Sequence, residues 1–361
     1  MLKRREVPMA GHIEIFKALR REILAGKYDV GRRLPSESAL ASRFGCSRPT
    51  ISRVTLDLKR EGLITTRRGA PSTITRFALN ATGALGLVVP GECYAEIFAP
   101  IRNKLEVLAE RTGWDLIHGE ILSEDPKVRA REVRRLAYRF STEHVAGVFF
   151  QPIEFVKDSE RANAEALEYF DRAGIAVVLL DYDIVPPPDR SRYDVVGIDN
   201  MAAGLSIGRH LVRTGAKKIA FLHRPGAALT VTDRMRGVSA AVVESGGTWT
   251  LDGNVLRAEP QNRRAVMRFL ERNSPDAFVA GNDVAAVRLG ETLRRIGSGA
   301  ETIRLAGFDD VECARSAGIT TVRQPLDDIA VAALQVLVSR IKSPGLPPRR
   351  ISLHAPLVVR G

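Results

Sequence analysis

The sequence predicts an α/β protein that begins with a small α+β module. Residues 34–53 have the pattern of two short helices joined by a tight turn, and residues 84–361 alternate short apolar runs with helical patterns. Charge separates the two parts, because residues 1–79 hold 17 Lys or Arg and 7 Asp or Glu, whereas the remainder holds 37 and 35. A chain of 361 residues is also too long for one ordinary domain.

Three helices are predicted in the N-terminal module. The first ends near Ala25–Gly26 and has apolar residues at helical spacing, namely Ile13, Phe16, Leu19 and Ile23. The second begins after Pro35 with Ser36 as its N-cap. Gly45 supplies the turn to the third, which Ser47 can cap. One face of the third helix is apolar and carries Ile51, Val54 and Leu58.

The start of the third helix is free to enter a DNA groove, as in a helix-turn-helix. Its side chains are basic or hydroxylated, and Pro49 lies in the first turn, where its missing N–H costs nothing. Two β-like runs, Leu63–Arg67 and Ser72–Arg76, complete a winged helix-turn-helix. Arg67 and Arg68 place charge at the wing tip, where Gly69 permits a tight turn. We therefore expect a DNA-binding domain at residues 1–78, and its positive charge agrees with a polyanionic partner.

Residues 13–74 resemble the GntR family of bacterial transcription regulators. The resemblance rests on the LPSE start at 34–37, the GxSRxT turn at 45–50 and the EGLIxxRxG wing at 61–69. It implies a homodimer on a two-fold-symmetric double-stranded operator. Ser38 and Ser52 stand where the family usually or often has Arg, so the operator is not inferred from relatives. The candidate DNA-binding residues are Ser36, Ser38, Ser47, Arg48, Pro49, Thr50, Ser52, Arg53, Arg67, Arg68 and Gly69.

Residues 79–83 are predicted to be a linker, and residues 84–361 a body of alternating strands and helices. The strand candidates are Leu85–Val89, Trp114–His118, Val145–Phe150, Ala176–Leu180, Val195–Ile198, Lys218–Leu222, Asn254–Arg257, Ala277–Ala280, Ile303–Ala306 and Ile319–Val322. The helical patterns include Ala99–Arg111, Pro126–Phe140, Met201–Thr214 and Arg236–Ser245. This alternation predicts two doubly wound parallel sheets. We assign lobe 1 to about 84–198 plus 324–345, and lobe 2 to about 199–320 plus 346–361.

Ligands of such sheets bind outside the carboxyl ends of the strands. The polar residues that follow the predicted strands are Gln151, Asp181, Asp199, Asn200, Asn282, Asp283, Asp309 and Asp310. Asp and Asn there can make paired hydrogen bonds to neighbouring hydroxyls, as a sugar requires. They can equally cap helices, and both interpretations stay open for Asp181, Asp199 and Asp283. Arg234 can add a charged fork, and Tyr94 and Phe98 an apolar face.

Residues 84–361 resemble the effector-binding domain of LacI-type repressors and the related ribose-binding periplasmic proteins. The matching motifs include LGLVVP at 85–90, VVGIDNMAAG at 195–204, DAFVAGND at 276–283 and IRLAGFDD at 303–310. The resemblance implies a two-lobed periplasmic-binding-protein-like fold, with Arg234, Asn282 and Asp309 at effector-contact positions. Tyr94 and Phe98 fall near the family's aromatic position. With Gln151 from the strand-end pattern, these six are the candidate effector-binding residues.

Together these observations predict a sequence-specific DNA-binding transcription regulator. We expect a repressor of carbohydrate-utilisation genes, controlled by a small carbohydrate or sugar phosphate between the lobes. Cys46, Cys93 and Cys313 are far apart, and phosphate-loop and HExxH motifs are absent, so no metal, cofactor or catalytic residue is expected.

The predicted location is the cytoplasm, without a membrane partner. No apolar run approaches the ~20 residues of a membrane span, and no apolar segment of a signal peptide follows the basic start. The missing signal argues against a transport binding protein. A sugar-modifying enzyme with a DNA-binding appendage is the alternative function.

Overall fold

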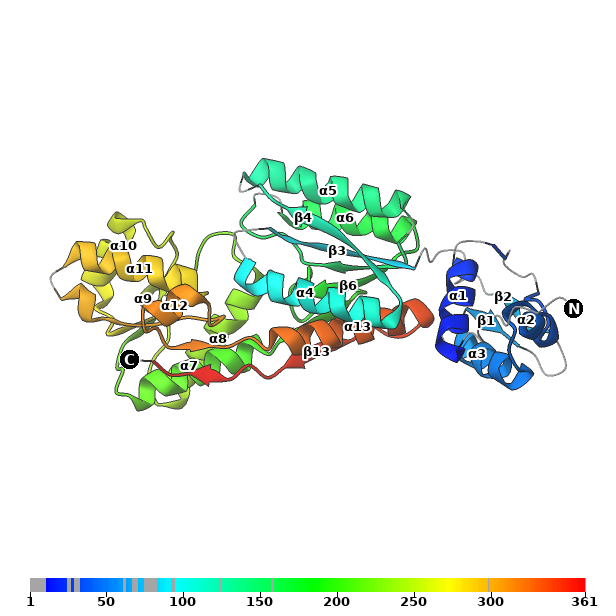
Figure 1. The fold of residues 1–361 in the computed structure, drawn as a ribbon. Helices are drawn as coiled ribbons and strands as arrows, with labels where there is room; N and C mark the ends of the chain where they lie inside the picture. Colours follow the sequence, from blue (N-terminus) through cyan, green and yellow to red (C-terminus); the bar gives the residue numbers. More distant parts are fainter. Residues whose placement is uncertain are drawn as a thin grey trace, which may run out of the picture.

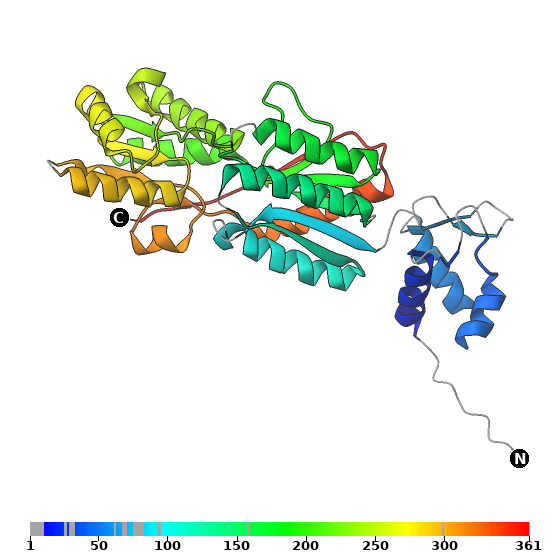
Figure 2. The same cartoon turned by 90° about the horizontal axis from the view of Figure 1, so that it is seen from above.

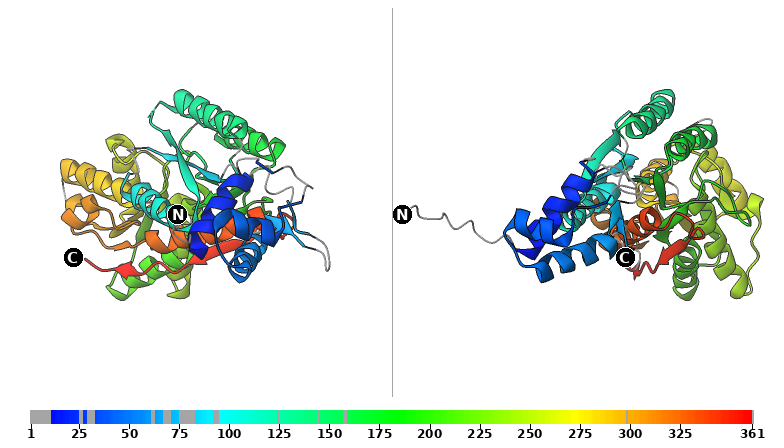
Figure 3. Two further views of the ribbon diagram at one scale, coloured as in Figure 1. Left: turned by 45° about the vertical axis from the view of Figure 1, so that its right-hand side comes forward. Right: turned by 90° about the vertical axis from the view of Figure 1, so that its right-hand side faces the viewer.

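The computed structural model describes residues 11–24, 27–28, 33–60, 63–66, 71–74, 83–91, 95–123, 125–143, 145–156, 159–297 and 299–360. An N-terminal module (residues 11–74) lies at one end of an elongated body (residues 83–360) made of two lobes (Figures 1 and 2). Figure 3 gives two further views of this arrangement, one of them from the module's end. The predicted linker at 79–82 lies outside the described residues.

The module has three helices and a short antiparallel β-hairpin. Its elements are α1 (His12–Leu24), α2 (Glu37–Phe44), α3 (Arg48–Arg60), β1 (Ile64–Thr65) and β2 (Thr73–Ile74). Ser36 caps α2, since its Oγ accepts a hydrogen bond from the Ala39 amide at 3.2 Å. Gly45 ends this helix at φ 63°, in the left-handed region that favours glycine. Because Ile51, Val54 and Leu58 of α3 are fully buried, the predicted winged helix-turn-helix is confirmed.

Lobe 1 is built on a parallel sheet in the order β13-β7-β6-β5-β3-β4. Its strands are β3 (Ala84–Pro90), β4 (Asp115–Ile121), β5 (Gly147–Phe150), β6 (Ala176–Leu180), β7 (Asp194–Ile198) and β13 (Arg350–Leu353). Helices α5 (Pro126–Thr142) and α6 (Ser159–Arg172) pack together on one face, and α4 (Ala95–Thr112) and α13 (Leu326–Lys342) on the other (Figure 1). Strands β3, β5 and β7 are buried along their whole length because helices cover both faces of the sheet.

Lobe 2 contains a second parallel sheet in the order β11-β10-β8-β9. Its strands are β8 (Ile219–Leu222), β9 (Val255–Leu256), β10 (Ala277–Ala280) and β11 (Arg304–Ala306). Its helices are α7 (Asn200–Arg213), α8 (Leu229–Glu244), α9 (Leu251–Asn254), α10 (Arg263–Asn273), α11 (Asp283–Ile296) and α12 (Glu312–Ser316), with a 3-10 turn at Ala300–Thr302. A separate antiparallel pair joins β12 (Thr321–Val322) to β14 (Leu357–Val358). Every predicted strand of the body is present, with ends shifted by a few residues.

The C-terminal segment corrects one predicted boundary. We expected residues 346–361 in lobe 2, but β13 pairs in parallel with β7 of lobe 1, from Arg350 opposite Val195 to Leu353 opposite Ile198. Only the part from β14 onward joins lobe 2. The chain therefore crosses between the lobes after β7, after β12 and after β13, and these crossings form the hinge.

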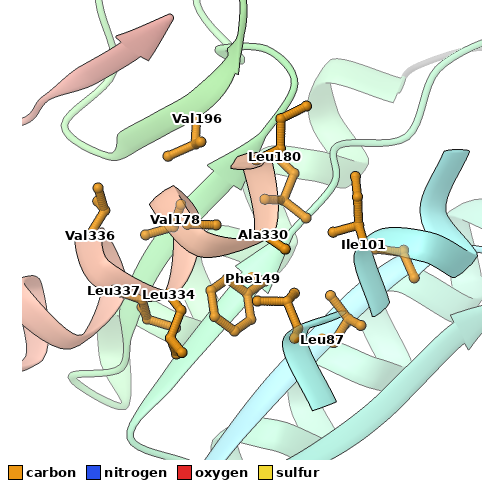
Figure 4. Packing of buried hydrophobic residues seen from close by; sticks show 14 of the residues in the cluster. Leu87, Ile101, Phe149, Val178, Leu180, Val196, Ala330, Leu334, Val336 and Leu337 are labelled. Carbon is orange, nitrogen blue, oxygen red and sulfur yellow. The ribbon is translucent and has the colours of Figure 1, made fainter. Parts of the chain in front are cut away.

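Lobe 1 has buried apolar clusters on both faces of its sheet, one under α5 and α6 and the other between the sheet and the α4–α13 layer (Figure 4). Phe149 and Val178 of the sheet face Ala330, Leu334 and Leu337 of α13, and all five are buried. This packing fixes α4 and α13 against the strands whose ends form the cleft described below. None of the helices in the described part of the chain is long and apolar enough to cross a membrane.

Candidate functional site

The exposed start of α3 forms the candidate DNA-contacting surface. Arg48, Ser52 and Arg53 are exposed, and neither arginine pairs with any other described residue. The Ser47 and Thr50 hydroxyls lie 2.8 Å apart and close the first turn, and the Thr50 amide donates to the Ser47 Oγ at 3.4 Å. The surface thus presents two unpaired guanidinium groups and several hydroxyls beside a helix N-terminus, an arrangement suited to phosphate and base contacts.

The remaining predicted DNA-binding residues divide into two groups. Ser36 serves α2 as a cap, and Ser38 is exposed on that helix. The predicted wing residues Arg67, Arg68 and Gly69 lie outside the described residues, as does the predicted effector contact Tyr94.

A cleft between the lobes brings together five of the predicted effector residues. They are Phe98, Gln151, Arg234, Asn282 and Asp309. Gln151 follows β5 and Asp181 follows β6, whereas Asn282 and Asp309 come from the ends of lobe 2 strands β10 and β11. The carboxyl ends of both sheets therefore face one space, as the strand-end argument predicts.

Arg234 of α8 is the buried cation of this cleft. Its Nε donates to the Asn200 Oδ1 at 2.8 Å and its Nη1 to the Gly281 carbonyl at 2.7 Å. Its Nη2 lies 3.6 Å from the Asp309 Oδ1, and the guanidinium carbon lies 4.7 Å from the centre of the Phe308 ring. These contacts fix the guanidinium and offset its charge with the Asp309 carboxylate.

Two acceptors in the cleft have no partner in the described part of the chain. The Gln151 Oε1 and the Asp181 Oδ1 are buried and accept no hydrogen bond from the described residues. Gln151 is 3% exposed, so water does not reach its amide freely. Because a buried acceptor without a donor is costly, these two atoms are open to a donor from a bound molecule.

Burial raises the pKa of several carboxyl groups around the cleft. It raises the pKa of Asp309 to about 6, even though Arg234 and a 2.7 Å hydrogen bond from Gln324 act in the opposite direction. Burial also raises the pKa of Asp181. The pKa of Glu154 is raised to about 7 by burial and by the nearby Asp181 charge, despite a hydrogen bond from the Ala228 amide. Such shifts are typical of functional clefts.

The structure decides the open question about the capping role of several strand-end residues. Asp199 caps α7, where it accepts from the Ala202 amide at 2.9 Å, and it does not line the cleft. Asp283 is fully buried and binds the Thr321 hydroxyl at 2.7 Å and the Val311 amide at 3.1 Å, so its role is structural. Asn282 does both, because it caps α11 through the Ala285 amide at 2.8 Å and lines the cleft.

Sequence reasoning missed three polar residues of the cleft, Glu154, Thr230 and Gln324. Glu154 lies four residues beyond the end of β5 in an irregular loop, and Gln324 lies in the hinge after β12. Gln324 follows the predicted strand Ile319–Val322 by two residues, so the strand-end pattern could have identified it. Glu154 has no comparable signal.

The lobes touch each other across the cleft. The Ala228 amide of lobe 2 donates to the Glu154 Oε2 of lobe 1 at 2.9 Å, and the Phe155 amide donates to the Gly226 carbonyl at 2.8 Å. The space that remains is only about 50 Å³. Ligand pockets usually measure ~300 Å³ or more, so the structure represents a closed arrangement of the lobes.

Comparison with known protein families agrees with this two-part architecture. Residues 13–74 match the family of bacterial regulatory proteins called the gntR family. Residues 209–361 match the periplasmic binding protein-like domain. The chain joins a gntR-type DNA-binding module to a periplasmic-binding-protein-like domain.

Similar proteins have the same layout or the same body. The arabinose metabolism transcriptional repressor of Geobacillus stearothermophilus is 24% identical over 357 residues, which cover 94% of this chain and 93% of the repressor. The transcriptional repressor PurR of Mannheimia succiniciproducens is 26% identical over 301 residues, 81% of this chain and 84% of PurR. With its module and these relatives, the chain is a transcription regulator.

Solved structures share the fold at lower identity. A complex of the transcriptional regulator CelR with cellobiose has a TM-score of 0.64 at 21% identity, and the match covers 91% of this chain and 99% of CelR. A LacI family regulator from Enterococcus faecium with bound ribose has a TM-score of 0.59 at 18% identity, and covers 77% of this chain and 97% of that regulator. These structures support the fold described here.

Proposed function

We propose that this regulator is a repressor of carbohydrate-utilisation genes whose operator affinity is set by a small carbohydrate bound between the lobes. The observation that carries the proposal is the cleft itself. It holds a fixed guanidinium and two buried acceptors without donors, at the carboxyl ends of both sheets. Polar groups of this kind around an apolar wall of Phe98 and Ile329 suit a hydroxylated ring. Similar folds that bind cellobiose and ribose support the same ligand class.

Ligand control requires that the carbohydrate bind one arrangement of the lobes more tightly than another. The three chain crossings between the lobes allow a hinge motion, and the small closed cleft must open before a sugar can enter. Closure around the sugar then changes how the module is held against lobe 1. Coupling of this kind is typically worth ~1–3 kcal/mol.

Assembly and location follow from the same proposal. We propose a homodimer in the cytoplasm on a two-fold-symmetric operator, held together through the lobes because the module is small and basic. We expect binding of the sugar without turnover, which distinguishes the regulator from a sugar-modifying enzyme. Light scattering of the full chain tests the dimer.

The test of the proposal combines ligand binding with operator binding. A thermal-shift screen against neutral, amino and phosphorylated sugars identifies compounds that bind the folded protein, because such compounds raise Tm. The hits are then added to the protein on promoter DNA from its own genomic neighbourhood, and affinity is measured by fluorescence anisotropy. A hit that changes operator affinity supports the proposal. A sugar that is chemically converted by the protein would contradict it.

A further inference from the structure

The cleft contains more acidic than basic groups. Among its described lining residues, the carboxyl groups belong to Glu154, Asp181 and Asp309, and Arg234 is the one cation. Arg129 and Arg350 also lower the pKa of Glu154 and Asp181, respectively, but neither of these arginines lines the cleft. The Asp181 charge raises the pKa of both Glu154 and Asp309, so Asp181 repels each of the other two carboxyl groups. Charge in this cleft is therefore unbalanced on the negative side.

The positive charge of Arg234 is not available to bind an anionic ligand. Its guanidinium already donates hydrogen bonds to Asn200 and Gly281 and forms an ion pair with Asp309. Remaining N–H groups can donate to a neutral hydroxyl, but the positive charge is offset by the Asp309 carboxylate. A phosphate or carboxylate group would have to displace Asp309 and stand close to two further carboxyl groups, in a space with little water to screen them.

The unpartnered atoms of the cleft are both acceptors. The Gln151 Oε1 and the Asp181 Oδ1 require donors, and phosphate oxygens have none to give. The Asp181 backbone is fixed against β7, because its amide donates to the Val196 carbonyl at 2.8 Å and Gly197 lets the two backbones approach closely. An ammonium group supplies three donors and a positive charge together, and hydrogen bonds to charged groups are the stronger ones.

We propose that the effector is a polyhydroxylated amine, such as an amino sugar, and that the cleft rejects phosphorylated and acidic sugars. The amine lies against Asp181 and Glu154, and the hydroxyls against Gln151, Arg234 and Asp309. This inference rests on the proposed function, because it names the ligand class of the same cleft. It narrows the expectation from the sequence, which included sugar phosphates.

The direct test compares ligands that differ in one group. Calorimetry at pH 7, where a hexosamine is mostly in its ammonium form, with hexosamines, the parent hexoses, their 6-phosphates and hexuronic acids gives the ranking. We expect an amino sugar to bind roughly tenfold or more tightly than its parent sugar, and the anionic forms not to bind. Tightest binding by a phosphate or an acid, or by a neutral parent, overturns the charge assignment. If no sugar of any class binds or alters operator affinity, the proposed function itself fails.

A second measurement tests, without any ligand, whether Glu154 is buried as a carboxyl group in the cleft. Since the folded pKa of Glu154 is about 7, above its ordinary value of 4.5, its contribution to stability is present below pH 4.5 and is lost as pH rises through 7. The Tm of the Glu154→Gln variant should therefore fall less between pH 5 and pH 8 than that of the wild type. Glu291→Gln, an exposed residue of α11, is the matched control. An unchanged pH profile in Glu154→Gln would overturn the assignment of Glu154 as a carboxylate contact of the amine.

Discussion

Arg48 is the exposed cation at the start of α3 that the structure leaves without a partner among the described residues. If it contacts the operator, Arg48→Ala removes either a base or a phosphate contact. For a base contact, we expect the free energy of operator binding to weaken by ~1–3 kcal/mol. For a phosphate contact, we expect weaker binding and a decrease of about one in the slope of log affinity against log salt concentration. Anisotropy at several salt concentrations separates these two cases.

The control for Arg48→Ala is Arg272→Ala, which removes an exposed cation from α10 of lobe 2. Operator affinity should stay at the wild-type value in the control. Effector binding should stay unchanged in both variants. Loss of effector binding in Arg48→Ala would refute the division of labour between module and body.

Asp309 tests the effector cleft at the same scale. Asp309→Asn keeps the shape of the side chain and an acceptor for Gln324, but removes the charge opposite Arg234. We expect effector affinity to fall about tenfold or more, while operator affinity without effector stays near wild type. Calorimetry and anisotropy on one preparation give both values. A normal effector response would place Asp309 outside the binding site.

Individual site residues were predictable where a regular element ends. Gln151, Asn282 and Asp309 follow buried strands, and the parallel topology brings such ends to one side. Glu154 was not predictable, because an irregular loop carries it and its contact with Ala228 comes from the other lobe. Local sequence cannot report a contact that depends on how two lobes meet.

The pair of helices α7 and α8 determines where Arg234 lies. Glycines allow their backbones to touch: a Cβ at Gly204 would lie 2.0 Å from the Arg234 carbonyl oxygen. Gly204→Ala must therefore push α8 away. Overpacking costs ~1–3 kcal/mol, so we expect a lower Tm and weaker effector binding together. Gly290→Ala in α11 is the control, since its Cβ would meet only the far end of the Leu305 side chain. Equal losses of Tm and effector affinity in both variants would contradict this role.

Helices and strands could be predicted from the sequence where their buried residues recur at regular spacing. The strands of the two sheet centres are continuous apolar runs, and each was found. Strand β13 was missed because it lies at the edge of the lobe 1 sheet, and its residues alternate between exposed and half-buried. Its assignment to lobe 1 depends on pairing with β7, more than 150 residues earlier in the chain. Periodicity carries no information about such a partner.

At the scale of the whole molecule, helix α4 joins the cleft to the DNA-binding module. Near its first turn, Ile97 and Phe98 line the cleft, and the Glu96 carboxylate accepts from the Glu312 amide of lobe 2 at 2.6 Å. At its other end, roughly 27 Å away for an 18-residue helix, the chain turns through Gly113 and Trp114. Arg20 of α1 donates to the Gly113 carbonyl and lies 4.8 Å from the centre of the Trp114 ring. A shift of α4 on closure therefore reaches the module directly.

Replacing Arg20 tests whether this contact transmits the signal. Arg20→Leu removes the hydrogen bond to Gly113 and the contact of a cation with Trp114, while α1 keeps its length and its buried face. Operator affinity without effector and effector affinity itself should stay near wild type. The change in operator affinity caused by the effector should fall from the ~1–3 kcal/mol of a typical coupling towards zero. Arg21→Leu, an exposed neighbour on the same helix, should keep the full response. If Arg20→Leu responds as strongly as Arg21→Leu, the signal does not pass through the end of α4. Helix α13, which packs along α4, then becomes the route to test.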